Sequence, residues 1–172
     1  MMIRKIALFL LFSLSVAAQA QETRYAFFSY QEVLNNMTDA QLAQQQLQKL
    51  RKQFDEEAKR SSLEFNEKYE EFLEGQHDFA PVIYKKRQAE LQDMMDKNIS
   101  FRQEAENHLS TTEETLMTPI KNRLNEAIRQ LGSQHGYAFI LNSDNNTLPY
   151  VDPSLCDDIT QQLIQLLNTH AK

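Results

Sequence analysis

More than half of the chain, from Thr38 to Leu131, contains a single glycine, Gly75, and has apolar residues at every third or fourth position. A stretch so poor in helix breakers and so rich in Gln, Glu and Lys predicts long amphipathic helix. Because Gly75 lies midway and Pro81 follows it, we predict that the stretch folds back on itself as a hairpin. Short apolar runs with strand character flank it. The predicted fold is therefore α+β: a small β base, a long antiparallel α-helical hairpin arm inserted after the first strand, and a C-terminal helix.

The first arm helix is predicted to begin at Thr38, where Gln41 completes a capping box, and to run to about Glu74. Its apolar positions lie on average about 3.6 residues apart, which places them in a single seam along one side of the helix. The residues of this seam are Leu47, Leu50, Phe54, Ala58, Ser61 or Ser62, Phe65, Tyr69 and Phe72.

The hairpin turn is predicted at residues 74–78, with Gly75 as a left-handed C-cap, Asp78 favouring the next helix start and Pro81 in its first turn. Pro119 is predicted to kink or briefly interrupt the second helix where the arm re-enters the base. A rise of about 1.5 Å per residue gives arms of about 50 Å. The seam of the second helix comprises Tyr84, Leu91, Met94 or Met95, Asn98, Phe101, Ala105, Leu109, Thr112, Leu116, Ile120, Leu124, Ala127 and Leu131.

The base is predicted from short segments on either side of the arm. Residues 24–29 are an aromatic run that predicts a strand, and residues 31–34 indicate a brief helical turn. After the arm, residues 137–141 predict a second strand, and residues 147–151 a third that Pro149 confines to an edge.

The last helix is predicted to start near Ser154 and Asp157 and to present a wide apolar face that includes Ile159 and Leu163. Together these elements predict one domain over residues 21–172. Its base comprises residues 21–37 and 120–172, and its coiled-coil arm comprises residues 38–119.

The first 20 residues have the pattern of a secretory signal peptide. Arg4 and Lys5 precede an apolar core at residues 6–16, and Ala18-Gln19-Ala20 supplies a small-x-small cleavage site before Gln21. The core is too short for a membrane anchor, which needs about 20 apolar residues. No later segment is apolar enough to cross a membrane, so we expect an exported, soluble product.

The predicted mature chain is acidic, with 16 Lys and Arg residues against 24 Asp and Glu residues after the two signal-peptide cations are removed. This net charge of −8 argues against nucleic acid as a partner and makes lipopolysaccharide a doubtful one, because both need clustered cations. Cys156 is the single cysteine, so no intrachain disulfide is expected, and we interpret it as a small, partly buried residue near a helix start.

The residues that would support catalysis or a cofactor are missing from the sequence pattern. The three glycines form no phosphate-binding loop, and the four histidines are scattered along the chain. Glu104 and His108 share a helix face, but no second ligand pair accompanies them. We therefore expect no enzyme activity, no cofactor and no metal.

Four segments, in order, resemble the Skp/OmpH family of periplasmic outer-membrane-protein chaperones. Residues 25–34 (YAFFSYQEVL) resemble the family's opening strand and its Q-x-V-L helical turn, and residues 116–120 (LMTPI) resemble the L-x-P-I at the root of the returning helix. Residues 136–141 (GYAFIL) resemble the G-Y-x-x-V-L-D strand, and residues 158–160 (DIT) the D-I-T before the last helix. The order and spacing over the whole mature chain carry the resemblance.

The resemblance implies a periplasmic homotrimer in which strands from three subunits form the base. Three arms would then enclose unfolded outer-membrane β-barrel proteins without ATP. One subunit offers only short strands with open edges, so strand faces would fill the shared base. The candidate residues for this trimer base are Tyr25, Phe27, Tyr137, Phe139 and Leu141.

The arm tip supplies the candidate client contacts, for which hairpin closure is the alternative role. These residues are Phe72, Phe79, Tyr84, Met94 and Met95. The chain departs from the family in charge: family members that bind outer-membrane proteins and lipopolysaccharide are often basic. Here residues 65–90 carry four cations against six acids, which argues against electrostatic capture. Polar seam positions at Ser61, Asn98 and Thr112 are predicted to let the arms flex.

A second function class remains open at this point. Long coiled-coil arms also suit a structural or adaptor protein of the envelope that binds one folded partner. Arm length and seam do not separate the two, whereas protection of several unfolded β-barrel proteins would identify the chaperone.

Overall fold

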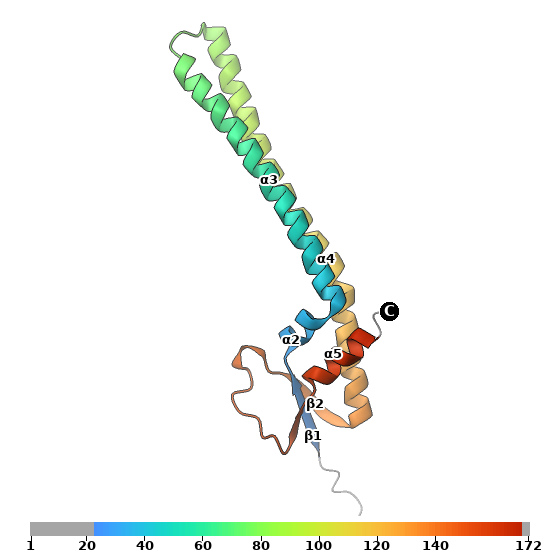
Figure 1. Ribbon diagram of the computed structural model, residues 1–172. Helices are drawn as coiled ribbons and strands as arrows, with labels where there is room; N and C mark the ends of the chain where they lie inside the picture. Colours follow the sequence, from blue (N-terminus) through green and yellow to red (C-terminus); the bar gives the residue numbers. More distant parts are fainter. Residues whose placement is uncertain (1–22, 170–172) are drawn as a thin grey trace, which may run out of the picture.

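A long two-helix arm projects from a small mixed base in the computed structural model, which describes residues 23–169 (Figure 1). The predicted signal peptide, with its cleavage site before Gln21, lies outside these residues. The elements in chain order are β1 (Arg24–Phe28), α2 (Tyr30–Asn36), α3 (Thr38–Gly75), α4 (Pro81–His135), β2 (Tyr137–Asn142), the 3-10 turn η1 (Asp144–Asn146), β3 (Cys156–Asp158) and α5 (Thr160–Thr169).

The arm is the antiparallel pair α3 and α4, which lies in the chain between the first and second strands. Helix α3 has 38 residues and α4 has 55, which correspond to about 57 Å and 82 Å of helix. The extra length of α4 re-enters the base and packs there against α5 and β2 (Figure 1). This arrangement confirms the predicted α+β class with its helical arm and C-terminal helix.

The base is a three-stranded parallel sheet in the order β2-β1-β3. One face of the sheet is covered by α2, α5 and the root of α4, and the core lies between them. Ala26 and Phe28 point into this core from β1, as the period of two in a strand requires. The largest fully buried side chains are Met37, Leu124, Ile159, Leu163 and Val33.

The predicted third strand at residues 147–151 is wrong, because the sheet takes residues 156–158 instead. Asn145 and Asn146 have positive φ values of 56° and 57°, and the Thr147 hydroxyl donates to the carbonyls of Asn142 and Asp144. These contacts curl the chain away from the sheet just where the predicted strand would begin. The sheet resumes only after the loop has returned to β1.

The end of that loop also corrects the predicted start of the last helix. Asp152 accepts hydrogen bonds from the N–H and hydroxyl of Ser154, which form a tight turn rather than a helix. Cys156 therefore lies in β3 and not at a helix start. Helix α5 begins at Thr160, whose N–H and hydroxyl both donate to Oδ1 of Asp158.

The predicted capping box at Thr38 is absent, because Met37 is the N-cap and Gln41 donates to the carbonyl of Asn35. The N–H and hydroxyl of Thr38 instead donate to Oδ1 of Asn168, 3.2 and 3.3 Å away on α5. A residue 130 positions downstream thus satisfies the free backbone donor at the root of the arm.

The predicted role of Gly75 is wrong, as is one of the two effects predicted for Pro119. Gly75 is the last residue of α3, and its backbone is not left-handed. The glycine in the left-handed conformation is Gly136, which follows α4 with a φ of 67°. What Gly75 provides is space, because a Cβ there would lie 2.6 Å from the ring of Phe79. Helix α4 runs through Pro119, so the predicted interruption is absent, while a kink at Pro119 stays a prediction.

The loop after β2 is tied to the start of α2 by Asp144. The Ser29 hydroxyl donates to its Oδ1 over 2.7 Å, and the Gln31 N–H donates to its Oδ2 over 2.9 Å. These hydrogen bonds, with that of Ser29 the strongest, hold the pKa of Asp144 below its usual value of 3.8. The ionised carboxylate of Asp144 therefore stabilises the folded state at neutral pH.

We expect Asp144→Asn to lower the thermal midpoint at pH 7 by about 2–4 °C, the shift that one hydrogen-bonded contact produces in a chain of this size. Because the folded-state pKa is depressed, this stabilisation is complete above the unfolded pKa and is lost as pH falls through the folded pKa. The midpoints of the two proteins should therefore converge below pH 3.8. A constant difference from pH 7 to pH 3 would contradict a role for the charge, as thermal melts across that range would show.

Candidate functional site

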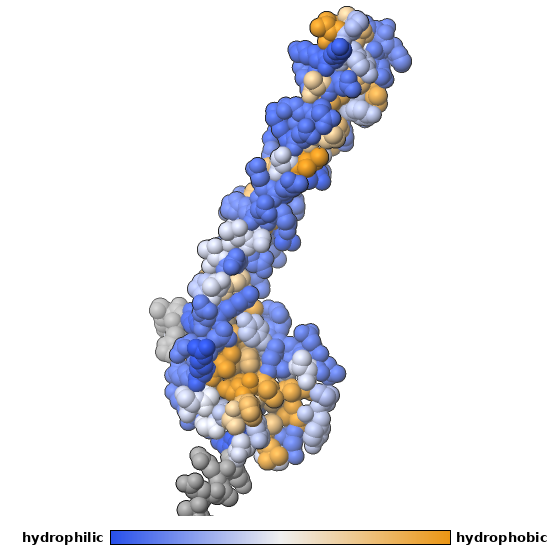
Figure 2. All heavy atoms as spheres, turned by 180° about the vertical axis from the view of Figure 1, so that it is seen from behind, coloured by the Kyte–Doolittle hydropathy of each residue, from blue (hydrophilic) through white to orange (hydrophobic). Residues whose placement is uncertain are grey.

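The outer face of the sheet carries exposed aromatic and aliphatic side chains. The strand register places Tyr25 beside Phe139 and Phe27 beside Leu141, with the rings of Tyr25 and Phe139 stacked at 6.1 Å and 2°. Phe139 is 63% exposed and Leu141 44% exposed, because no helix of residues 23–169 covers this side. Seen from behind, apolar surface gathers over the base (Figure 2). Exposed apolar patches of this kind are typical of interaction surfaces.

Tyr137, the fifth residue predicted for the trimer base, is placed differently. A register shift between Arg24 and Tyr25 pairs Tyr137 with Arg24, and its ring packs against the edge of the subunit's own core. Its hydroxyl donates to Asp157 over 2.7 Å, and the Arg24 guanidinium lies 5.6 Å from its ring centroid. Burial, followed by the bond to Asp157, raises the pKa of the Tyr137 hydroxyl. Four of the five residues thus share the outer face.

The seam of the arm lies largely where the periodicity predicted it. Phe54 and Phe101 meet edge to face with centroids 6.1 Å apart, and Ala105 and Leu109 are buried below them. Tyr69 and Tyr84 are exceptions, because they are 45% and 36% exposed; Tyr69 stacks on Phe65.

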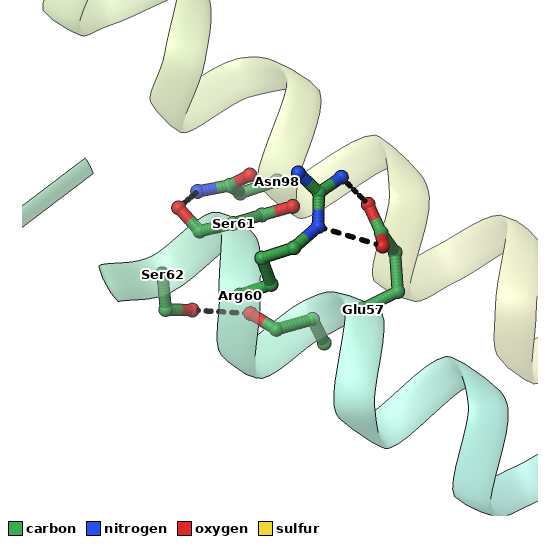
Figure 3. Close-up of polar contacts among 6 residues, drawn as sticks. Glu57, Arg60, Ser61, Ser62 and Asn98 are labelled. Carbon is green, nitrogen blue, oxygen red and sulfur yellow. Dashed lines mark hydrogen bonds and ion pairs between the residues drawn. The ribbon is translucent and has the colours of Figure 1, made fainter. Parts of the chain in front are cut away.

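The middle of the seam is polar. Asn98 of α4 donates from Nδ2 to the carbonyl of Ser61 on α3 over 3.3 Å (Figure 3). Ser62 donates to the carbonyl of Ala58, one turn earlier in α3, over 2.7 Å. Arg102 of α4 also reaches Ser62 Oγ, at 2.9 Å. A long hydrogen bond in a half-buried position contributes less than apolar packing would, so the two helices are held more weakly here.

We expect Asn98→Leu to slow amide exchange around residues 58–66 and 94–102 about fivefold, which corresponds to about 1 kcal/mol from a half-buried leucine. Asn107→Leu is the matched control, because it makes the same change at an exposed position of the same helix. Equal slowing in the two variants would show that helix propensity, and not the polar seam, sets the exchange rate.

The arm tip has an aromatic cluster centred on Phe72. Its ring centroid lies 6.2 Å from that of Phe79 and 5.2 Å from that of Tyr84. Beside this cluster is a hollow of about 330 Å³, here named the tip pocket. Its lining residues are Lys68, Glu71, Phe72, Phe79, Arg87, Glu90, Leu91, Asp93 and Met94.

The tip pocket separates the predicted client contacts into two groups. Phe72, Phe79 and Met94 line it, whereas Tyr84 packs on Phe72. Met95 is 40% exposed and lines a different hollow, of about 240 Å³, that also includes Phe65 and Ile99. Whether any of these residues contacts a client remains a prediction.

Sequence reasoning missed apolar residues that the tip exposes. They are Val82 at 76%, Ile83 at 45% and Leu73 at 42% exposure. The adjacent pair after Pro81 was a usable signal, because two aliphatic residues in a charged segment fit neither the seam nor a solvated face.

The described residues contain neither a metal-binding group of side chains nor a membrane-spanning helix. Within residues 23–169, no three His, Cys, Asp or Glu residues are grouped so that they could hold a metal ion. None of the helices in that range combines the length and apolarity that a membrane crossing requires.

Comparison with known proteins places the chain in a family. A solved structure from Caulobacter crescentus CB15, proposed to be an OmpH-like outer membrane chaperone, has the same fold, with a TM-score of 0.72 and 15% identity. The match covers 87% of this chain and 86% of that chain. A search of curated proteins gives no significant match. The sequence model of the family described as outer membrane protein (OmpH-like) matches residues 24–167, nearly all of the described chain. The chain therefore belongs to the Skp/OmpH family.

Proposed function

We propose that the protein is an ATP-independent periplasmic holdase chaperone, a homotrimer whose arms enclose unfolded outer-membrane β-barrel proteins. The observation that carries this proposal is the exposed outer face of the sheet, with Phe139 63% exposed beside Tyr25, Phe27 and Leu141. No strand of residues 23–169 lies beyond β2 or β3, so both edges of the sheet are open. Copies of the same surface would cover these groups in a closed assembly.

The arms suit the retention of an unfolded chain. Their exposed apolar side chains are separated by charged residues, and they form small patches up to the tip (Figure 2). Leu63, Leu73, Val82 and Ile99 are examples, each more than two-fifths exposed. Three arms would offer many such contacts at once, so a client is retained by multivalency while each contact remains short-lived.

The acidic charge bears on how clients are captured, and the predicted signal peptide bears on where the protein acts. Three of the four cations of the arm tip are paired with acids: Lys68 with Glu71 at 2.9 Å, and Lys86 and Arg87 with Glu90 at 3.5 and 3.2 Å. Capture of clients then depends on apolar contact more than on attraction to anionic groups, and lipopolysaccharide is a poor ligand. Residues 1–20 would direct the chain across the inner membrane.

The test is a paired measurement on residues 21–172. Light scattering should give the mass of a trimer for the protein alone. A defined soluble complex should form when a urea-unfolded outer-membrane β-barrel protein is diluted into it without nucleotide. A trimer that leaves the client to aggregate would favour an adaptor that binds one folded partner. A monomer would overturn the shared base.

A further inference from the structure

We propose that the tip pocket binds one aromatic side chain from an unfolded strand of an outer-membrane β-barrel protein. This inference rests on the proposed function, because that function supplies the unfolded strand. It makes the tip a site with a preference for ring-bearing segments, in place of a uniformly apolar end.

The volume of the tip pocket suits a single large side chain. A cavity of about 150 Å³ lined by Leu, Ile and Phe accepts benzene. The tip pocket, at about 330 Å³, therefore has room for an indole or phenol ring together with the methylene group that joins it to the backbone.

The walls of the pocket favour an aromatic ring over an aliphatic group of equal size. The rings of Phe72 and Phe79 are tilted by 45°, so a third ring can meet one of them by its edge and the other by its face. Leu91 and Met94 of α4 also line the pocket, and a thioether makes favourable contacts with ring edges. The space that holds Phe79 in this position depends on Gly75.

The charged side chains that line the pocket, here called its rim, disfavour a charged occupant. Lys68 is paired with Glu71 and Arg87 with Glu90, while Asp93 is paired with Lys97 at 2.6 Å. An incoming ion would have to separate one of these pairs to gain a partner. A neutral ring leaves them intact, and the polar rim remains available to the residues that flank the ring.

Strands of β-barrel membrane proteins have the matching pattern. Their apolar and polar side chains alternate, and aromatic residues form girdles at both membrane interfaces. In an extended segment neighbouring side chains point in opposite directions, so one ring can enter the pocket while its polar neighbours lie along the charged rim.

The alternative occupant of the pocket is an aromatic residue from the arm tip of a second copy of this protein.

The chain contains no tryptophan, so a tryptophan in a peptide reports binding without background. The probe is a ten-residue peptide of alternating Ser and Thr with one central Trp, mixed with the trimer of residues 21–172. We expect its emission to shift to the blue on binding. A twin peptide with Leu in place of Trp should compete about tenfold more weakly. Equal competition would overturn the aromatic preference.

Neighbouring methionines provide a matched pair of variants. Met94→Gln removes a wall of the pocket and should weaken probe binding about tenfold, whereas Met95→Gln makes the same change outside it and should alter binding less than about twofold. Phe79→Leu, in the turn outside both helices, should also weaken binding. Equal losses at Met94 and Met95 would overturn the pocket in favour of diffuse apolar contact.

The same protein preparation separates failure of this inference from failure of the proposed function. A trimer that keeps an unfolded β-barrel protein soluble but leaves the probe emission unchanged overturns the pocket and not the chaperone. Probe binding together with client aggregation overturns the client as occupant and the holdase with it. Tip-to-tip association of trimers that Met94→Gln abolishes would identify a second copy as the occupant.

Discussion

Phe139→Asp should convert the proposed trimer to monomers with one-third of its mass. The side chain is 63% exposed in the single subunit, so its removal leaves the subunit's own core intact. In a shared base the new carboxylates would be buried without partners, at about 3–5 kcal/mol for each uncompensated charge. Light scattering measures the mass, and circular dichroism should show that the long helices persist.

Val82→Asp is the matched control for that experiment. It introduces the same carboxylate at a residue that is 76% exposed, but at the far end of the arm. The mass of this variant should stay at that of the wild-type protein. If Phe139→Asp also kept the wild-type mass, the outer face of the sheet would not be the assembly surface.

Leu163→Ala should lower the free energy of unfolding of the base by about 2–5 kcal/mol. Leu163 of α5 is fully buried in a core that also holds Leu124 and Met37, and the small base cannot close the cavity by collapse. Because the total stability of a folded domain is typically about 5–15 kcal/mol, this loss is a large fraction of it. Urea unfolding at a fixed protein concentration measures the loss, since assembly links stability to concentration.

Leu63→Ala deletes the same atoms from a position on α3 that is 54% exposed. Its unfolding free energy should lie within about 0.5 kcal/mol of the wild-type value. Similar losses in the two variants would mean that the base core does not set the stability of the chain.

Local periodicity explains why the arm could be predicted from sequence. The spacing of Phe54, Phe65 and Phe101 determines which side of each helix turns inward, wherever the arm points. Its ends were harder to predict, because the residue that satisfies the start of α3 is Asn168, which no local pattern links to Thr38.

The third strand could not be predicted for a related reason. Cys156, Asp157 and Asp158 lack strand propensity and become a strand only because β1 lies beside them. The segment at residues 147–151 has that propensity, but a tight turn at Asn145 and Asn146 directs it elsewhere.

The residues of the arm tip also show that sequence periodicity alone cannot decide which side chains lie together. Their apolar character indicated a contact surface, but the seam period did not distinguish Met94 from Met95. Only the helix pairing shows that Met94 lines the same hollow as Phe72 and Phe79, while Met95 lines another hollow together with Ile99. Gly75 was predicted to shape the backbone, whereas it makes room for a ring.

The position of β1 in the middle of the sheet has a consequence for the order of folding. Arg24 pairs with Tyr137 and Tyr25 with Cys156, so the central strand must wait for partners more than 100 residues downstream. Such distant pairings carry a large loop-closure entropy and fold slowly. The hairpin between these strands can form stepwise from its turn, because each new contact between α3 and α4 lies next to one already made. The completed hairpin brings Met37 and Ile120 together in the base. The arm would thus help the base to fold, by bringing β1 close to β2 and β3, before it takes part in any binding.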